Sequence, residues 1–264
     1  MKIIVLAKQV PDTRNVGANA MKADGTINRA ALPTVFNPED LKALEMALQV
    51  KDQIAGSTVT VITMGPPRAE EIIRDARSRG ADDGFVLSDA RFAGSDTLAT
   101  SYALAKAIES VGHFDIVFCG RQAIDGDTAQ VGPQIAEKLA LPQITYAEAM
   151  ESISDKEIVI RRRLEHGVET VKAALPALVT VTSAAPDCRY PPAHRLLRYA
   201  KTPVEMKNAD DVNPDFSRLG LAGSPTKVKK VDNVVLAHKD NVRLEPTDDN
   251  LNEMMHTLIA EHII

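Results

Sequence analysis

Short apolar runs alternate with longer helical patterns through the first half of the chain. The apolar runs lie at residues 3–7 (IIVLA), 57–67 (STVTVITMGPP), 84–89 (GFVLSD) and 114–120 (FDIVFCG). Helical patterns follow the first three runs, at residues 36–56, 68–80 and 95–112. This alternation is typical of βαβ units, whose right-handed crossovers cover both faces of a sheet. The sequence therefore predicts an α/β fold on a doubly wound parallel sheet.

Capping residues mark where these helices begin. Asn37 suits the N-cap of the first helix and Pro38 its first position, and Asp96 suits the N-cap of the third helix. Residues 14–36 have no clear periodicity. We interpret them as an excursion with a hairpin near Asp24-Gly25.

The second half of the chain has a different pattern. Residues 157–173 (EIVIRRRLEHGVETVKA) predict a β-hairpin that turns near His166-Gly167, and residues 175–182 (LPALVTVT) predict a return to a buried strand. The sequence then becomes rich in proline, with too few apolar residues for a core of its own. We therefore expect an α/β domain at residues 1–185 and a C-terminal arm at residues 186–264 that packs on another protein.

Charge and residue content exclude several classes of protein. Lys and Arg number 31 against 36 Asp and Glu, so there is no basic excess to bind nucleic acid. The two cysteines, Cys119 and Cys188, are too few for a disulfide scaffold. The six histidines show neither triad nor metal spacing, so we expect no metal site and no catalytic acid–base pair. The apolar run at residues 3–7 is too short for a signal peptide or a membrane span, which predicts a cytoplasmic protein without membrane insertion.

A strongly polar loop follows the fourth predicted strand, within FCGRQAIDGDTAQVGPQIAEKL (118–139). In an open parallel sheet, ligands bind beyond the carboxyl ends of the strands, and a helix N-terminus offers free N–H groups to phosphate. Gly120 and Gly126 permit close backbone approach, and Arg121 can pair with an anionic group. The spacing alone fits a nucleotide site and an ordinary capped turn equally well. Neither GxGxxG nor GxxxxGK[ST] is present, so no Rossmann dinucleotide site or P-loop is predicted.

Four segments in the same order resemble the β subunits of electron transfer flavoproteins. They are NPEDLKALEMALQ (37–49), VTVITMGPP (59–67), GRQAIDGDTAQVGPQIAEKLALPQIT (120–145) and LPALVTVTSAAPDCRY (175–190). The resemblance spans essentially the whole chain. It implies an α/β domain of the adenine-nucleotide-hydrolase type and a heterodimer in which the C-terminal segment wraps around an FAD-holding α subunit. In the common version of the family, the β subunit binds AMP.

Further segments resemble the electron-bifurcating branch of this family. They are TMGPP (63–67), SDARFAGSDTLATS (88–101) and GDTAQ (126–130). That resemblance implies a second FAD in place of AMP, with NADH as substrate. Such a subunit is a redox carrier that is catalytic only within its complex. It sends one electron to the α-subunit FAD, and then to a flavin-dependent dehydrogenase, and the other to ferredoxin or flavodoxin. The alternatives are a structural AMP that supports the α flavin and, less well matched to the C-terminal arm, a stand-alone nucleotide-binding protein.

The resemblance also implies the cofactor-binding residues. They are Leu6, Asn37, Pro38, Glu39, Asp40, Met64, Asp96, Thr97, Gly120, Arg121, Gln122, Ala123, Ile124, Asp125, Gly126, Asp127, Thr128, Ala129, Gln130 and Val131. Leu6 and Met64 would bind the adenine through backbone groups, and Asp127, Thr128 and Gln130 would bind phosphate and ribose. Gly65 and Pro66 would border the approach of NADH.

Several of these residues also have simpler explanations. Asn37 and Asp96 suit helix caps, Met64 suits the core, and Asp125 suits a turn. Arg121 is the hardest to explain without a ligand, because a charged group at a strand end needs an anionic partner or solvent.

Residues 189–201 (RYPPAHRLLRYAK) occupy the position of the family's recognition loop. The resemblance implies partner docking by Tyr190, Ala193, His194, Arg195 and Leu196. The family usually places an apolar anchor three residues after the tyrosine. Ala193 stands there in this sequence, which predicts a different dehydrogenase or a different docking mode.

Overall fold

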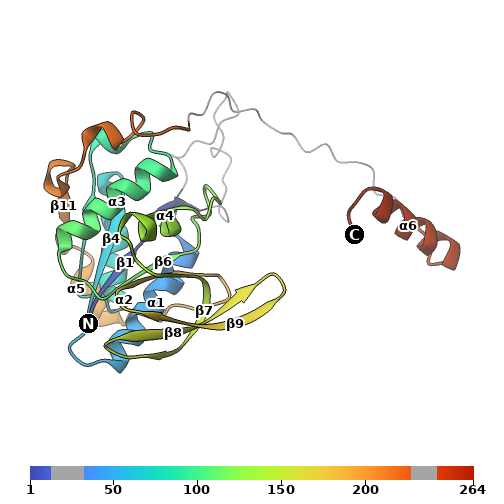
Figure 1. Cartoon of the computed structure of the whole chain (residues 1–264), viewed down its shortest axis with the longest axis horizontal. Helices are drawn as coiled ribbons and strands as arrows, with labels where there is room; N and C mark the ends of the chain where they lie inside the picture. Colours follow the sequence, from blue (N-terminus) through green and yellow to red (C-terminus); the bar gives the residue numbers. More distant parts are fainter. Residues whose placement is uncertain (13–32, 227–242) are drawn as a thin grey trace. The chain divides into compact units, whose positions relative to one another are not determined.

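The computed structural model describes residues 1–12, 33–226 and 243–264. Contacts divide the chain into two compact units, Met1–Lys229 and Lys230–Ile264. Nine strands of the described residues form one sheet at the centre of the first unit (Figure 1). Their order across the sheet is β11, β5, β4, β1, β6, β10, β7, β8 and β9. The hairpin predicted near Asp24-Gly25 lies outside the described residues.

The sheet is mostly parallel. The parallel strands are β1 (Lys2–Leu6), β4 (Thr58–Met64), β5 (Asp83–Leu87), β6 (Ile116–Gly120), β7 (Gln143–Ile153), β10 (Ala177–Val181) and β11 (Glu205–Lys207). Two short strands, β2 (Gln9–Pro11) and β3 (Thr34–Phe36), form a separate two-stranded antiparallel sheet. The predicted α/β class and parallel sheet are therefore confirmed.

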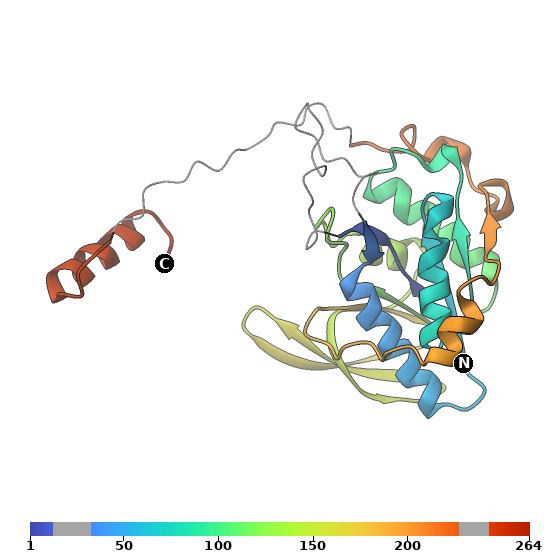
Figure 2. The ribbon, with the colours of Figure 1, turned by 180° about the vertical axis from the view of Figure 1, so that it is seen from behind.

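Helices cover both faces of the sheet. They are α1 (Pro38–Gln53) and α2 (Glu70–Arg79) on the face toward the viewer in Figure 2, and α3 (Thr97–Val111) and α4 (Val131–Lys138) on the face toward the viewer in Figure 1. Ile3 and Val5 of β1 pack in the core with α1 and α2. Ile4 and Leu6 pack in the core with α3 and α4. Because alternate side chains enter opposite cores, the strands read as continuous apolar runs.

The strand order reverses at β1. The next strands along the chain, β4 and β5, lie on one side of β1, whereas β6 and β10 lie on the other. Leu6 at the end of β1 is paired with Ile62 of β4 and with Cys119 of β6. Doubly wound sheets bind ligands beyond the carboxyl ends of the strands where the order reverses. We call this place, bounded by residues 7–9 and 120–130, the switch point.

The predicted hairpin insertion is present as β8 (Glu157–Leu164) and β9 (Gly167–Ala174), which extend the sheet antiparallel from β7. Its arginines alternate between the two faces. Arg161 and Arg163 both pair with Glu148, whereas Arg162 pairs with Glu169. The turn lies between Leu164 and Gly167, as the sequence predicted.

The chain after residue 185 contains more regular structure than its proline content suggested. Helix α5 (Ala193–Tyr199) packs on α2, and β11 adds to the edge of the sheet beside β5. The first compact unit continues to Lys229, so residues 186–226 pack with the α/β domain, although we expected the arm to begin at 186. These elements are too short to show a period in the sequence.

The described part of the second unit contains the helix α6 (Asp248–Ala260). Thr247 caps the start of this helix, since its hydroxyl accepts a hydrogen bond from the Asn250 N–H. Four large apolar side chains of this helix are exposed, at Leu251, Met254, Met255 and Ile259. Within residues 1–12, 33–226 and 243–264, no helix combines the length and apolar character that a membrane span requires.

Candidate functional site

A buried carboxyl group joins the two walls of the switch point. Asp40, in the first turn of α1, accepts a hydrogen bond from the Lys8 N–H at 2.9 Å and another from the Gly120 N–H at 2.8 Å. One carboxyl group thus fixes the ends of β1 and β6 together. Burial raises the pKa of Asp40 to about 7, although both N–H donors favour its ionised form.

Asn37 fixes the loop that follows β6. Its side chain is fully buried and donates to the Gln122 carbonyl at 2.8 Å, while its oxygen accepts from the Ile124 N–H at 3.2 Å. Asn37 occupies the N-cap position of α1, but its side chain makes no capping bond to the helix. The sequence therefore located the helix start correctly, but this side chain fixes the loop instead of capping α1, and its contact with a cofactor stays a prediction.

Arg121 has an anionic partner within the chain. Its guanidinium lies 3.3 Å from the carboxylate of the buried Glu39, which also accepts from the Gln122 and Ser183 N–H groups. On another side, the guanidinium lies 5.8 Å from the ring centroid of Tyr146. Arg121 therefore does not need a ligand to balance its charge.

Tyr146 is a residue that sequence reasoning missed. Its φ is 61°, in the left-handed region that non-glycine residues seldom adopt, and it lies within an irregularity in the pairing of β7 with β10, between Ile144 and Ala147. Such strain is more common at functional sites than elsewhere. The sequence gives no signal for this backbone conformation, because a tyrosine in the run LPQITYA is what an ordinary strand would contain.

Two helices begin beside the loop at residues 121–130. Asp96 caps α3 as predicted, since its carboxylate accepts from the Leu98 and Ala99 N–H groups. The Thr97 hydroxyl donates to the Gln130 side-chain oxygen at 2.8 Å. The start of α3 is thus tied to the start of α4, and two predicted site residues from distant segments meet.

The start of α4 has the backbone form of an anion site. The helix begins at Val131, and Gln130 at its N-cap makes no side-chain capping bond. Asp127 and Ala129 have φ values of 48° and 52°, and Gln130 returns to the right-handed helical region. A left-handed residue followed by a right-handed one turns successive N–H groups toward one concavity, which favours an anion.

A second cross-link over the switch point involves a residue that the sequence did not single out. The Lys8 ammonium donates to both carboxylate oxygens of Asp125, at 2.7 and 2.8 Å. Gln122 donates in turn to Asp127 at 2.7 Å. Asp125 is thus an ion-pair partner as well as a turn residue. The position of Lys8 directly after the apolar run 3–7 is the sequence signal that could have identified it as a site residue.

The remaining predicted cofactor and NADH residues lie at the same edge of the sheet. Leu6 is buried at the end of β1, and Met64 ends β4, the neighbouring strand. Gly65 donates its N–H to the Leu87 carbonyl and precedes Pro66. Contacts of these residues with a cofactor stay predictions.

The predicted docking residues lie elsewhere, because α5 packs on α2. The Arg195 guanidinium donates to the Arg77 and Ser78 carbonyls near the end of α2, so it is engaged within the chain. Tyr190 is 92% exposed. Leu197, which the prediction omitted, is 82% exposed.

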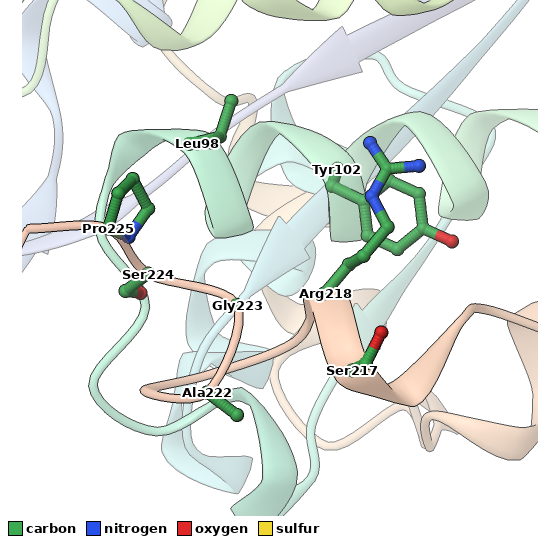
Figure 3. A pocket seen from close by; sticks show the side chains of 8 residues that line it. All are labelled: Leu98, Tyr102, Ser217, Arg218, Ala222, Gly223, Ser224 and Pro225. Atoms are coloured by element: carbon green, nitrogen blue, oxygen red, sulfur yellow. The ribbon is translucent and has the colours of Figure 1, made fainter.

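A cavity of about 380 Å³ opens beside the first turns of α3 (Figure 3). Its lining residues are Leu98, Tyr102, Ser217, Arg218, Ala222, Gly223, Ser224 and Pro225. The Arg218 guanidinium lies 3.9 Å from the centroid of the Tyr102 ring. One lining residue, Leu98, directly follows Thr97 in the sequence, but none of the residues predicted to bind a cofactor lines the cavity.

Known proteins match the chain over most of its length. Residues 24–212 match the electron transfer flavoprotein domain family. The electron transfer flavoprotein subunit beta of Thermoanaerobacterium thermosaccharolyticum is 48% identical over 86% of each chain, and that of Clostridium acetobutylicum is 43% identical over the whole of each. The caffeyl-CoA reductase-Etf complex subunit CarD of Acetobacterium woodii is 43% identical over 86% of each. The chain therefore belongs to the electron transfer flavoprotein β-subunit family.

Proposed function

We propose that this β subunit pairs with an α subunit and binds a second FAD at its switch point, where NADH reduces it. The observation that supports this most is the meeting of two helix starts at one loop. The Thr97–Gln130 hydrogen bond joins α3 to α4 beside the concavity at Ala129 and Gln130. FAD has a pyrophosphate and so needs more donors than the single phosphate of AMP.

The residues present fit such a group. The backbone N–H groups of residues 129–132 would bind phosphate, and Thr128 and Gln130 would bind ribose and phosphate oxygens. The bound FAD would supply hydride acceptance from NADH and single-electron transfer to the α-subunit FAD and to ferredoxin or flavodoxin. Gly65 and Pro66 would border the approach of NADH, since they follow β4 next to β1 at the same edge.

The chain's own residues prepare this place before any ligand binds. Asp40 and Asn37 fix the loop to β1 and α1 through hydrogen bonds to backbone groups. Glu39 holds the Arg121 guanidinium at the strand end. There the guanidinium would attract negative charge on a bound group. Such preorganisation lowers the entropy cost of binding.

The alternative is a structural AMP, and one observation favours it. The Asp96 carboxylate already accepts from the Leu98 and Ala99 N–H groups, which leaves α3 fewer donors for a second phosphate. In this version the subunit would support the α flavin and dock partners without reacting with NADH.

The partner of the complex is also a proposal. A relative of this chain is named as a subunit of a caffeyl-CoA reductase–Etf complex, which supports docking of a flavin-dependent reductase or dehydrogenase. Tyr190 and Leu197 are the exposed side chains best placed as anchors on α5 and its preceding turn. We propose a cytoplasmic location for this complex.

Anaerobic reduction tests the proposal. The chain would be co-purified with its α subunit and mixed with NADH, the dehydrogenase, its acceptor and ferredoxin. Ferredoxin should be reduced by NADH only while the acceptor is also being reduced. Flavin that is reduced by the dehydrogenase but not by NADH would contradict the proposal. That result would favour the alternative in which the subunit binds a structural AMP.

A further inference from the structure

Lys8 has a fixed backbone and an accessible side chain. Its N–H donates to Asp40 at 2.9 Å, and its carbonyl accepts from the Asn37 N–H at 2.9 Å. The side chain is 47% exposed, and its ammonium binds both oxygens of Asp125. The position of Lys8 is therefore set by the fold, while its charged end is free to exchange partners.

The Lys8–Asp125 pair spans the switch point. Lys8 follows β1, and Asp125 lies in the turn after β6, where the Gly126 and Asp127 N–H groups both donate to the Ala123 carbonyl. The side chain of Lys8 is 47% exposed and that of Asp125 is 18% exposed, so the pair is partly open to water, and such ion pairs contribute little to the stability of a fold. Stability alone is thus a weak reason for a lysine to be placed across this loop.

The charges around the switch point make Lys8 the available cation. Four carboxyl groups belong to residues at the switch point, namely Glu39, Asp40, Asp125 and Asp127. Among the described residues that contact these four, the positively charged side chains are Lys8, paired with Asp125, and Arg121, paired with Glu39. Arg121 is paired with the buried Glu39 and is less exposed than Lys8, at 30% against 47%. A phosphate entering among these acids needs a cation, and Lys8 can turn to it more readily.

We propose that Lys8 binds a phosphate of the nucleotide and that Asp125 holds Lys8 while the site is empty. The two partners compete for one ammonium group, so binding breaks the Lys8–Asp125 pair. The pair acts as a latch across the switch point, because its opening releases the Asp125 carboxylate on one side and the cation on the other. This inference rests on the proposed nucleotide site.

The test uses the full-length chain freed of nucleotide, with AMP, ADP and adenosine as probes in titration calorimetry. Lys8→Met should weaken AMP binding about tenfold, as expected for a lost charge-assisted hydrogen bond. Asp125→Asn should strengthen it about two- to fivefold, because the competing exposed ion pair is removed. Adenosine lacks phosphate, so neither substitution should change its affinity.

Matched variants separate the latch from general charge effects. Lys51→Met and Asp187→Asn remove single charges from other ion pairs, with Asp82 and Lys42, and should leave AMP affinity unchanged. In the double variant Lys8→Met/Asp125→Asn, the gain from Asp125→Asn should disappear. Thermal unfolding of each variant checks that it folds.

The outcomes distinguish this inference from the function on which it rests. AMP binding by the wild type that Lys8→Met leaves within twofold would overturn the latch but not the nucleotide site. Wild type that binds neither AMP nor ADP would overturn both. A gain from Asp125→Asn that persists without Lys8 would show a general charge effect and also reject the latch.

Discussion

Replacing Gly120 by alanine tests whether the switch point depends on close backbone approach. A Cβ at this position would lie 2.8 Å from the Asp40 backbone nitrogen and 2.9 Å from the Glu39 carbonyl carbon, and it would also overlap the Asp40 carboxylate. Real Cβ contacts essentially never come this close, and two of these atoms belong to the backbone. The first turn of α1 must therefore move away from the end of β6.

The expected loss of stability is large for one methyl group. Overpacking of this kind typically costs about 1–3 kcal/mol. The movement also lengthens the two backbone hydrogen bonds to Asp40, each of which contributes about 1 kcal/mol. We expect Gly120→Ala to lower the free energy of unfolding by about 3 kcal/mol.

Urea denaturation followed by circular dichroism measures this change as a shift in midpoint. Gly167→Ala in the β8–β9 hairpin is the matched control, since a Cβ there meets nothing within 4 Å. It should change the free energy of unfolding by less than about 0.5 kcal/mol. If Gly120→Ala were as stable as this control, the close packing of α1 against β6 would be refuted.

Three further predictions follow from the same structure. Burial raises the pKa of Asp40 from 3.8 to about 7, so the native state binds its proton more tightly than the unfolded state. The free energy of unfolding should therefore fall as the pH rises between those two values. Denaturation curves taken across this range should show a weaker dependence on pH for Asp40→Asn than for the wild type. An unchanged pH dependence would contradict the raised pKa of Asp40. Burial also raises the pKa of Cys188 to about 11 and raises that of Cys119 further. Thiol reagents should therefore label both cysteines slowly until the chain unfolds. Rapid labelling of Cys119 in the native protein would contradict its burial. Tyr190→Ala and Leu197→Ala should each weaken binding of the partner dehydrogenase about tenfold or more in surface plasmon resonance, with flavin content unchanged, and equal affinity of both variants and wild type would exclude this surface.

The strands and helices were predictable because their periods are long and their caps are distinct. Runs such as residues 3–7 and 116–120 are buried on both faces, and Asp96 caps α3 through its own side chain. The short elements α5 and β11 were not predictable, because a few residues show no period. Their positions depend on distant partners, such as the Arg195 bonds to carbonyls of α2.

The candidate site was predictable as a place but not as a set of contacts. The sequence put residues 120–131 beyond a strand end, and the fold brings Thr97 and Gln130 together there. It could not show that Asn37 binds the loop instead of its own helix, or that Glu39 neutralises Arg121. These partners are about 80 or more residues apart, and only the tertiary fold pairs them.

The most direct test of the proposed function is a count of nucleotides. The chain would be purified with its α subunit, denatured, and the released nucleotides separated by chromatography. We predict two FAD and no AMP for each heterodimer, one FAD from each subunit. One FAD with one AMP would contradict the second-flavin proposal and make the loop at residues 120–130 a structural AMP site.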